Sequence, residues 1–265
     1  MNPHVRLGMV RSPLVSGGVI GVWPMMQDSA DTSVLDVSGR GRHLALGGGL
    51  TTAEAWATAA WLSTVNASTD DTVPIPLAQW SDYSFNVGDS LLIALRFKAA
   101  APASTETWLG QGYGTSNHGW RFVVKSTGVV APWLDHAGGT KFLGDTTGVA
   151  ADSAEHSLMF AWWNHDVRAA TAKYMFWVDG ARAYSAVQGA TSLPTSIDPV
   201  DDLRIGGRKT GASSYDAMAA QFRGLHIYRA AANVPFSASE FDAIASRLWR
   251  SPFVPLSRSE LRAEM

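Results

Sequence analysis

Residues 173–180 read KYMFWVDG, and they follow a second aromatic run, HSLMFAWWN, at residues 156–164. Asp179 and Gly180 form an Asp-Gly pair after an apolar run, and this pair strongly indicates a β-hairpin because a type I′ turn needs positive φ at both central positions. Side chains alternate across a strand, so Phe176 and Trp177 must point to opposite faces of a sheet. The stretch therefore predicts strands, with a tight hairpin turn at residues 179–180.

Adjacent aromatic residues on one strand have two interpretations. Like Phe176 and Trp177, the neighbours Trp162 and Trp163 must face opposite sides of the sheet. Either these strands are covered on both faces, as buried apolar strands commonly are, or one face presents aromatic rings to a groove suited to stacking on sugars. The first interpretation is the more common arrangement, and the second stays open.

Further apolar runs with the period of a strand lie on both sides of this stretch. In SLLIALRFK (90–98) alternate residues from Leu91 to Phe97 share one face, and WRFVVK (120–125) alternates in the same way from Trp120. Other predicted strands are VIGVW (19–23), HLALG (43–47), LRIGG (203–207) and QFRGLHIYR (221–229). About a dozen short strands with glycine-rich turns predict an all-β sandwich or barrel.

One helix is predicted near the end of the chain. Ser237 and Glu240 form a capping box, apolar residues then recur at helical spacing, and Pro252 follows. These features predict a helix over residues 237–250.

The composition excludes several kinds of chemistry. The 265 residues include no cysteine and 11 tryptophans, and the net charge of the chain is −2. Without cysteine there is no disulfide framework, no thiol catalysis and no cysteine-ligated metal. The charge gives no reason to expect nucleic acid or an anionic membrane as a partner. No run of 18 apolar residues predicts a membrane span, and the first residues lack the apolar core of a secretory signal.

The positions of the glutamates bear on catalysis. Retaining glycoside hydrolysis needs two carboxyl groups about 5.5 Å apart, which alternate residues of one strand can supply. The chain has only six glutamates, and none has a carboxylate partner at that spacing. Phosphate-loop, zinc-protease and serine-hydrolase motifs are also missing from the sequence. The sequence therefore predicts a protein without enzymatic activity.

Several motifs occur in an order typical of one superfamily. They are DVSGRGRHL (36–44), SLLIALRFKA (90–99), HSLMFAWWN (156–164), YMFWVDGA (174–181), LRIGGR (203–208), FRGLHIYRAA (222–231) and the closing amphipathic helix. The chain resembles the laminin-G-like, concanavalin A-like lectin jelly-roll superfamily over about residues 19–250. The ending LWRSPFVPL (248–256) is similar to that of such domains in phage virion proteins.

This resemblance implies a two-sheet antiparallel jelly-roll sandwich with a calcium site at its rim. Asp36, with Asp28 and Asp31 nearby, would supply carboxylate ligands, so calcium is an expected but not a required cofactor. His226 stands where the family has an acidic residue, and imidazole is a poor calcium ligand. The alternative is that Asp36 and Ser38 cap the backbone of their own turn.

The main functional prediction is a non-enzymatic virion surface or structural protein of a tailed phage, such as a head decoration, spike or tail-appendage component. Residues 1–18 are expected to be a docking arm, residues 19–250 the jelly-roll domain, and residues 251–265 a tail. Arm and tail would dock onto other virion proteins or a sister copy, so the protein is expected to be a homo-oligomer in the virion, assembled in the host cytoplasm.

Two alternatives come from other functional classes. The first is a carbohydrate-binding module that attaches to cell-surface glycans, with contact residues chosen from aromatic and polar positions near the predicted turns: Trp80, Trp108, Asn117, His118 and Trp133. The second is a glycan-active enzyme with an atypical carboxylate dyad.

Overall fold

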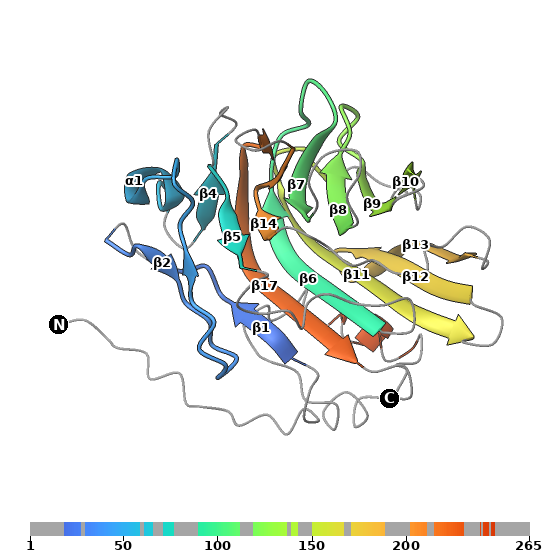
Figure 1. The fold of residues 1–265 in the computed structure, drawn as a ribbon. Helices are drawn as coiled ribbons and strands as arrows, with labels where there is room; N and C mark the ends of the chain where they lie inside the picture. The colour runs from blue at the N-terminus through green and yellow to red at the C-terminus, as the bar shows by residue number, and fades with distance from the viewer. Residues whose placement is uncertain are drawn as a thin grey trace.

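A computed structural model gives the arrangement of the strands (Figure 1). It describes residues 19–27, 30–58, 61–65, 71–76, 90–111, 119–136, 139–142, 150–166, 171–188, 202–210, 215–230, 239, 241–243, 245 and 246. The predicted arm and tail lie outside these residues, so the predicted domain boundaries stay predictions.

Seven strands form the larger sheet. In spatial order they are β1 (Val19–Trp23), β17 (Ala220–Ala230), β6 (Ser90–Lys98), β11 (Glu155–Asp166), β12 (Thr171–Val178) and β13 (Ala181–Gln188), with β4 (Leu62–Thr64) also paired to β17. Every pairing in this sheet is antiparallel. Figure 1 shows its long strands running side by side with a common curvature.

Six shorter strands form the second sheet. Their order is β10 (Gly139–Phe142), β9 (Val130–His136), β8 (Gly119–Val124), β7 (Glu106–Gly110), β14 (Leu203–Ile205) and β5 (Val73–Ile75). The described residues also form two two-stranded pairs, β2 (Ser33–Val34) with β3 (Leu44–Ala45) and β15 (Gly207–Lys209) with β16 (Tyr215–Ala217), and the short helix α1 (Thr52–Ala55). The predicted fold class, an all-β, two-sheet antiparallel jelly-roll sandwich with a short C-terminal helix, is confirmed.

The main core lies between the two sheets. The alternate residues of β6 predicted to share a face, from Leu91 to Phe97, are buried in it, as are Trp120 and Phe122 of β8. Aromatic rings from both sheets meet at its centre, where Phe122 contacts Phe160 and Phe176 edge-on at ring-centroid distances of 5.1 and 6.0 Å. The period-two pattern of these strands therefore identified the inward face correctly.

A second apolar cluster lies on the opposite face of the larger sheet. Its sheet residues alternate with those of the main core, and it closes against Phe241 and Ala245; the members from the strands are Leu92, Ala94, Met159, Ala161, Met175, Trp177 and Tyr228. Residues 239, 241–243, 245 and 246 are helical. The predicted C-terminal helix therefore exists and covers this face of the sheet.

The two interpretations of the paired aromatics can now be separated for β12. Phe176 lies in the core between the sheets, and Trp177 lies under the C-terminal helix. Both side chains are buried, which confirms coverage on both faces at this position. The side chains of Trp162 and Trp163 lie outside the described residues. The hairpin turn is also confirmed, with φ of 52° at Asp179 and 78° at Gly180.

Candidate functional site

A row of side chains crosses the outer face of the six-stranded sheet. Strand register places Arg204 of β14 opposite Gly110 of β7, Gly110 opposite Arg121 of β8, and Arg121 opposite Trp133 of β9. The sequence neighbours of Arg121, Trp120 and Phe122, point into the core, so Arg121 points outward. Two arginines thus flank a glycine, with a tryptophan at one end of the row; we call these four residues the arginine row.

Arg121 is held against an aromatic ring. Its guanidinium carbon lies 4.5 Å from the centroid of the Trp133 ring, a cation–π distance. The side chain is buried although it points away from the core. Burial and stacking restrict the guanidinium to few rotamers, which lowers the entropy cost of presenting it to a ligand.

Arg204 is fixed at the other side of the glycine. Its Nη1 donates a hydrogen bond to Thr72 Oγ1 at 3.0 Å, and its Nη2 lies 3.9 Å from the Asp202 carboxylate. The Arg204 side chain is also buried. Both arginines of the row are therefore positioned by neighbours before any ligand arrives.

Gly110 lets the groups around it approach closely. A Cβ at this position would lie 2.8 Å from Thr107 Cγ2, 3.0 Å from Arg121 Cβ and 3.3 Å from Arg208 Cβ. These contacts bring a third arginine, Arg208 of β15, next to the row. Arginine side chains on neighbouring strands beside an indole ring are groups that can pair with a carboxylate and pack against a sugar ring.

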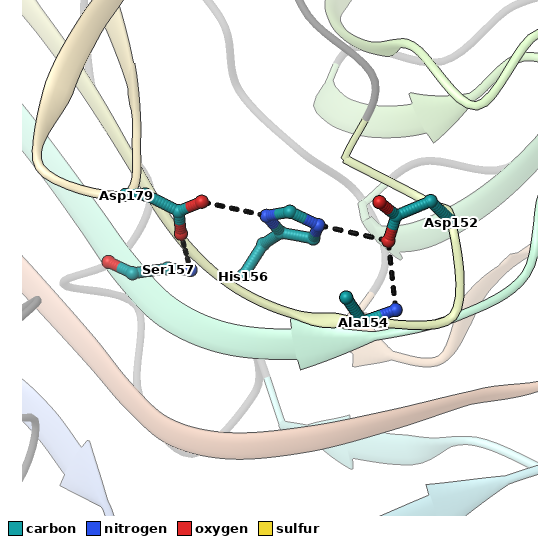
Figure 2. A network of polar contacts seen from close by, with 5 residues as sticks. All are labelled: Asp152, Ala154, His156, Ser157 and Asp179. Atoms are coloured by element: carbon teal, nitrogen blue, oxygen red, sulfur yellow. Dashed lines mark hydrogen bonds and ion pairs between the residues drawn. The ribbon is translucent and has the colours of Figure 1, made fainter.

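A second polar cluster joins the loop before β11 to the turn between β12 and β13 (Figure 2). His156 lies between two carboxylates, with Nδ1 2.8 Å from Asp179 Oδ2 and Nε2 3.0 Å from Asp152 Oδ1. The same carboxylates accept backbone N–H bonds, Asp179 from Ser157 at 2.9 Å and Asp152 from Ala154 at 2.8 Å. We call the three titratable residues the His156 bridge.

The pKa shifts in the His156 bridge come from the hydrogen bonds that its three residues make with one another and with the backbone. Burial lowers the pKa of His156, but hydrogen bonds to Asp179 and then Asp152 outweigh it and raise the pKa above the ordinary 6.5. The backbone N–H of Ala154 and then His156 lower the pKa of Asp152. Both ring nitrogens of His156 contact carboxylates, so this imidazole is engaged in holding the turn.

The residues predicted to contact sugar do not share one site in the structure. Trp133 lies on the outer face, in the arginine row. The prediction for Trp108 was wrong, because this ring is 1% exposed and stacks in the core on Phe97 and Phe122 at 5.3 and 5.2 Å. Trp80, Asn117 and His118 lie outside the described residues, so their roles stay predictions.

The proposed calcium ligands do not converge on a cation in the described part of the chain. One Asp36 oxygen accepts from the N–H groups of Val22 and Ser38, and the other accepts from Ser38 Oγ and the N–H of Arg42. A carboxylate with four donors on its two oxygens does not fit a calcium ligand, and Asp36 and Ser38 cap their turn as the alternative predicted. Asp31 is half-buried, and Asp28 lies outside the described residues. Calcium binding at Asp28 and Asp31 stays a prediction.

Comparison with known proteins shows which solved structures are similar to this chain. No family model and no curated protein matches the sequence. Among solved structures, the chain is similar to Trypanosoma rangeli sialidase in complex with sialic acid, with a TM-score of 0.58 and 15% identity. A mutant of that sialidase with trans-sialidase activity also has a TM-score of 0.58, with 11% identity. The carbohydrate-binding domain CBM40 of Ruminococcus gnavus IT-sialidase, bound to α2,3 sialyllactose, has a TM-score of 0.51 and 14% identity.

The coverage of these matches is unequal. The chain matches over 89% of its own length but over only 33% of the T. rangeli sialidase. It matches over 70% of its length and over 97% of the R. gnavus CBM40 domain. The chain therefore spans about a third of a sialidase, and its sandwich has the size of a whole CBM40 domain. These likenesses show the fold, an antiparallel jelly-roll β-sandwich.

The comparison corrects one prediction. The sequence predicted a protein without enzymatic activity, because its glutamates form no strand-spaced pair. The similar structures include sialidases, so this fold class includes chains of glycan-hydrolysing enzymes. The missing pair argues against one type of catalytic dyad and does not support a non-enzymatic protein.

No helix among the described residues is long and apolar enough to cross a membrane.

Proposed function

We propose that this sandwich binds sialylated glycans through the outer face of its six-stranded sheet. The observation that carries the proposal is the arginine row, in which two buried arginines stand on either side of Gly110. The similarity to a CBM40 domain bound to sialyllactose supports the same ligand class.

The geometry suits an acidic sugar. Neighbouring strands lie about 4.8 Å apart, so the backbones of Arg204 and Arg121, separated by one strand, are about 10 Å apart. This span fits one sugar ring with its carboxylate. Guanidinium forks match carboxylate oxygens, and Trp133 offers an apolar edge to the ring carbons. A neutral sugar has no carboxylate, so it would gain only the packing contact with Trp133.

A binding measurement with matched variants tests the proposal. Isothermal titration calorimetry of the full chain compares 3′-sialyllactose with lactose. We expect 3′-sialyllactose to bind and lactose to bind at least about tenfold more weakly, since a charge-assisted hydrogen bond contributes about 1.5–3 kcal/mol. Arg121→Gln should lower the affinity for 3′-sialyllactose by a similar factor.

The control is an arginine of the same kind on the other sheet. Arg223 lies 5.7 Å from the ring centroid of Trp61, much as Arg121 lies over Trp133. Arg223→Gln should leave 3′-sialyllactose binding unchanged. Equal affinities for 3′-sialyllactose and lactose, or equal losses in the two variants, would overturn the proposal. Free sialic acid is assayed in the same samples, and its release would make this chain a sialidase as well as a binder.

We further propose, on the sequence resemblance alone, that the protein is carried on a tailed-phage particle. Residues 1–18 and 251–265 would dock it to other virion proteins or to a sister copy. Mass spectrometry of purified particles tests this location: the peptide fragments of the chain should be present at a constant ratio to the capsid protein, and their absence would overturn it.

A further inference from the structure

The hairpin turn between β12 and β13 holds a peptide bond that is prone to covalent rearrangement. Asp179–Gly180 is the one Asp-Gly pair in the 265 residues, and the sequence has no Asn-Gly pair. At such pairs the side-chain carbonyl carbon can be attacked by the next backbone nitrogen, because glycine has no side chain to obstruct the approach. Asp179 is therefore the position of this chain at which isoaspartate would form most readily.

The rearrangement needs no co-reactant other than water. The Gly180 nitrogen attacks Asp179 Cγ and closes a five-membered succinimide, while the Cγ–OH bond breaks and the hydroxyl leaves as water with the amide proton. Water then cleaves the bond between the Asp179 backbone carbonyl carbon and the Gly180 nitrogen, so the chain stays joined through Cγ as isoaspartate. The Asp179 side chain is 33% exposed, so solvent reaches the site.

The fold ties down the carboxylate that would have to react (Figure 2). Oδ1 of Asp179 accepts the Ser157 N–H at 2.9 Å, and Oδ2 lies 2.8 Å from His156 Nδ1. The Asp179 N–H itself donates to the Ser157 carbonyl at 2.9 Å. His156 is held in turn by Asp152 Oδ1, 3.0 Å from its Nε2. Any rotation that brings Cγ against the Gly180 nitrogen has to break these bonds to Asp179.

The backbone on both sides of the turn is also fixed. Val178 pairs with Ala181 at the turn, and the buried Trp177 pairs with Arg182 one step further along. We propose that the His156 bridge protects Asp179–Gly180 from isomerisation, and that Asp179 becomes a modification site when the bridge opens. Isoaspartate would insert a methylene group into the backbone, so the tight turn could not re-form with the same strand register.

Peptide mapping of the aged protein tests this protection. The full chain is incubated at physiological pH and temperature, and mass spectrometry with electron-transfer fragmentation distinguishes isoaspartate from aspartate at residue 179. We expect the folded wild type to isomerise at least about tenfold more slowly than the denatured wild type. His156→Phe keeps a ring but has no donor for Asp179. In the folded state it should isomerise at least about tenfold faster than the wild type, the factor that one charge-assisted hydrogen bond supplies.

The control separates loss of the bridge from loss of stability. Gly206→Ala places a Cβ 2.4 Å from Thr64 Cγ2, a contact that leaves the bridge residues untouched. It should isomerise at Asp179 at close to the wild-type rate. The proposal is overturned if folded His156→Phe matches the wild type, or if Gly206→Ala accelerates the reaction as much as His156→Phe. Should His156→Phe not fold, equal rates in the folded and the denatured wild type would overturn it.

Discussion

Single residues decide several local features of this sandwich, and Gly206 is constrained both by its backbone conformation and by its packing. Its φ is +89°, and a Cβ there would lie 2.4 Å from Thr64 Cγ2. Thr64 cannot move away freely, because its Oγ1 donates a hydrogen bond to the Met218 carbonyl at 2.7 Å. Both the backbone conformation and the packing therefore require glycine in the LRIGG run.

We expect Gly206→Ala to destabilise the protein by about 2–6 kcal/mol, because left-handed strain and overpacking each cost about 1–3 kcal/mol. Chemical denaturation measures the difference in the free energy of unfolding. Gly48→Ala is the control, since a Cβ at Gly48 meets nothing within 4 Å and its φ lies outside the left-handed region. A loss below about 1 kcal/mol in Gly206→Ala would contradict the account.

The His156 bridge predicts a pH-dependent contribution to stability. A histidine whose pKa is raised on folding stabilises fully below its unfolded pKa of 6.5, and the contribution is lost as the pH rises through the folded value. Asp152, whose pKa is lowered, stabilises above its unfolded value of 3.8, and the contribution is lost as the pH falls through the folded value. The bridge is therefore complete between about pH 4 and pH 6.

Thermal unfolding of the wild type and of His156→Gln across pH 4–9 tests this behaviour. The difference in Tm should be largest at mildly acidic pH and should narrow above neutral pH, because His156 then loses the proton that bonds the second carboxylate. A Tm difference between wild type and His156→Gln that stays constant over this range would show that the pKa of His156 does not change on unfolding.

At the scale of secondary structure elements, the C-terminal helix contributes to a second core on the outer side of the larger sheet. Phe241 is fully buried against Trp177 at a ring-centroid distance of 5.9 Å. Asp242 Oδ1 accepts a hydrogen bond from Trp177 Nε1 at 2.7 Å, and Asp242 also pairs with Arg182. The helix thus converts an apolar outer strip of the sheet into a second core.

We expect Phe241→Ala to destabilise the protein by about 3–5 kcal/mol, the usual cost of removing a buried aromatic side chain. Chemical denaturation followed by tryptophan fluorescence measures it, since Trp177 reports on this contact. Ala100→Ser, at an exposed position away from the helix, is the control and should change stability by less than about 0.5 kcal/mol. An equally small effect of Phe241→Ala would mean that the helix is not part of the folded core.

Local patterns explain which elements the sequence predicted. Strand β1 coincides with the predicted run 19–23, and the alternation in β6 and β8 identified their inward faces. Helix α1 was missed although Thr51 and Glu54 form a capping box, because its single turn carries no apolar periodicity. Trp108 was misplaced because it was assigned to a turn region, whereas the structure has strand β7 over Glu106–Gly110, with a register shift between Thr107 and Leu109. Such a bulge breaks period-two alternation, and Trp108 and Leu109 both enter the core.

The arginine row illustrates what the sequence could not reveal. Arg121 was visible as an outward residue of WRFVVK, but Arg204 and Gly110 come from strands far apart along the chain. Their alignment depends on strand order and register, which are set by long-range pairing and not by local propensity. Of the candidate site, the sequence predicted Trp133 and an aromatic contribution, while the arginines emerged only from the folded sheet.

At the scale of the whole molecule, the two sheets differ in how their outer faces are used. Part of the larger sheet is sealed by the C-terminal helix, and the rest carries Arg96 and Arg223. The smaller sheet carries the arginine row. The core between the sheets is one cluster with aromatic rings at its centre, and the strands of both outer faces pack on it.

Calorimetry of the full chain with 3′-sialyllactose and with lactose, alongside Arg121→Gln, shows whether the arginine row binds sialylated glycans. We expect at least about a tenfold preference for the sialylated sugar, lost in Arg121→Gln and kept in Arg223→Gln. No preference for the sialylated sugar, or a preference that Arg121→Gln leaves intact, would contradict it.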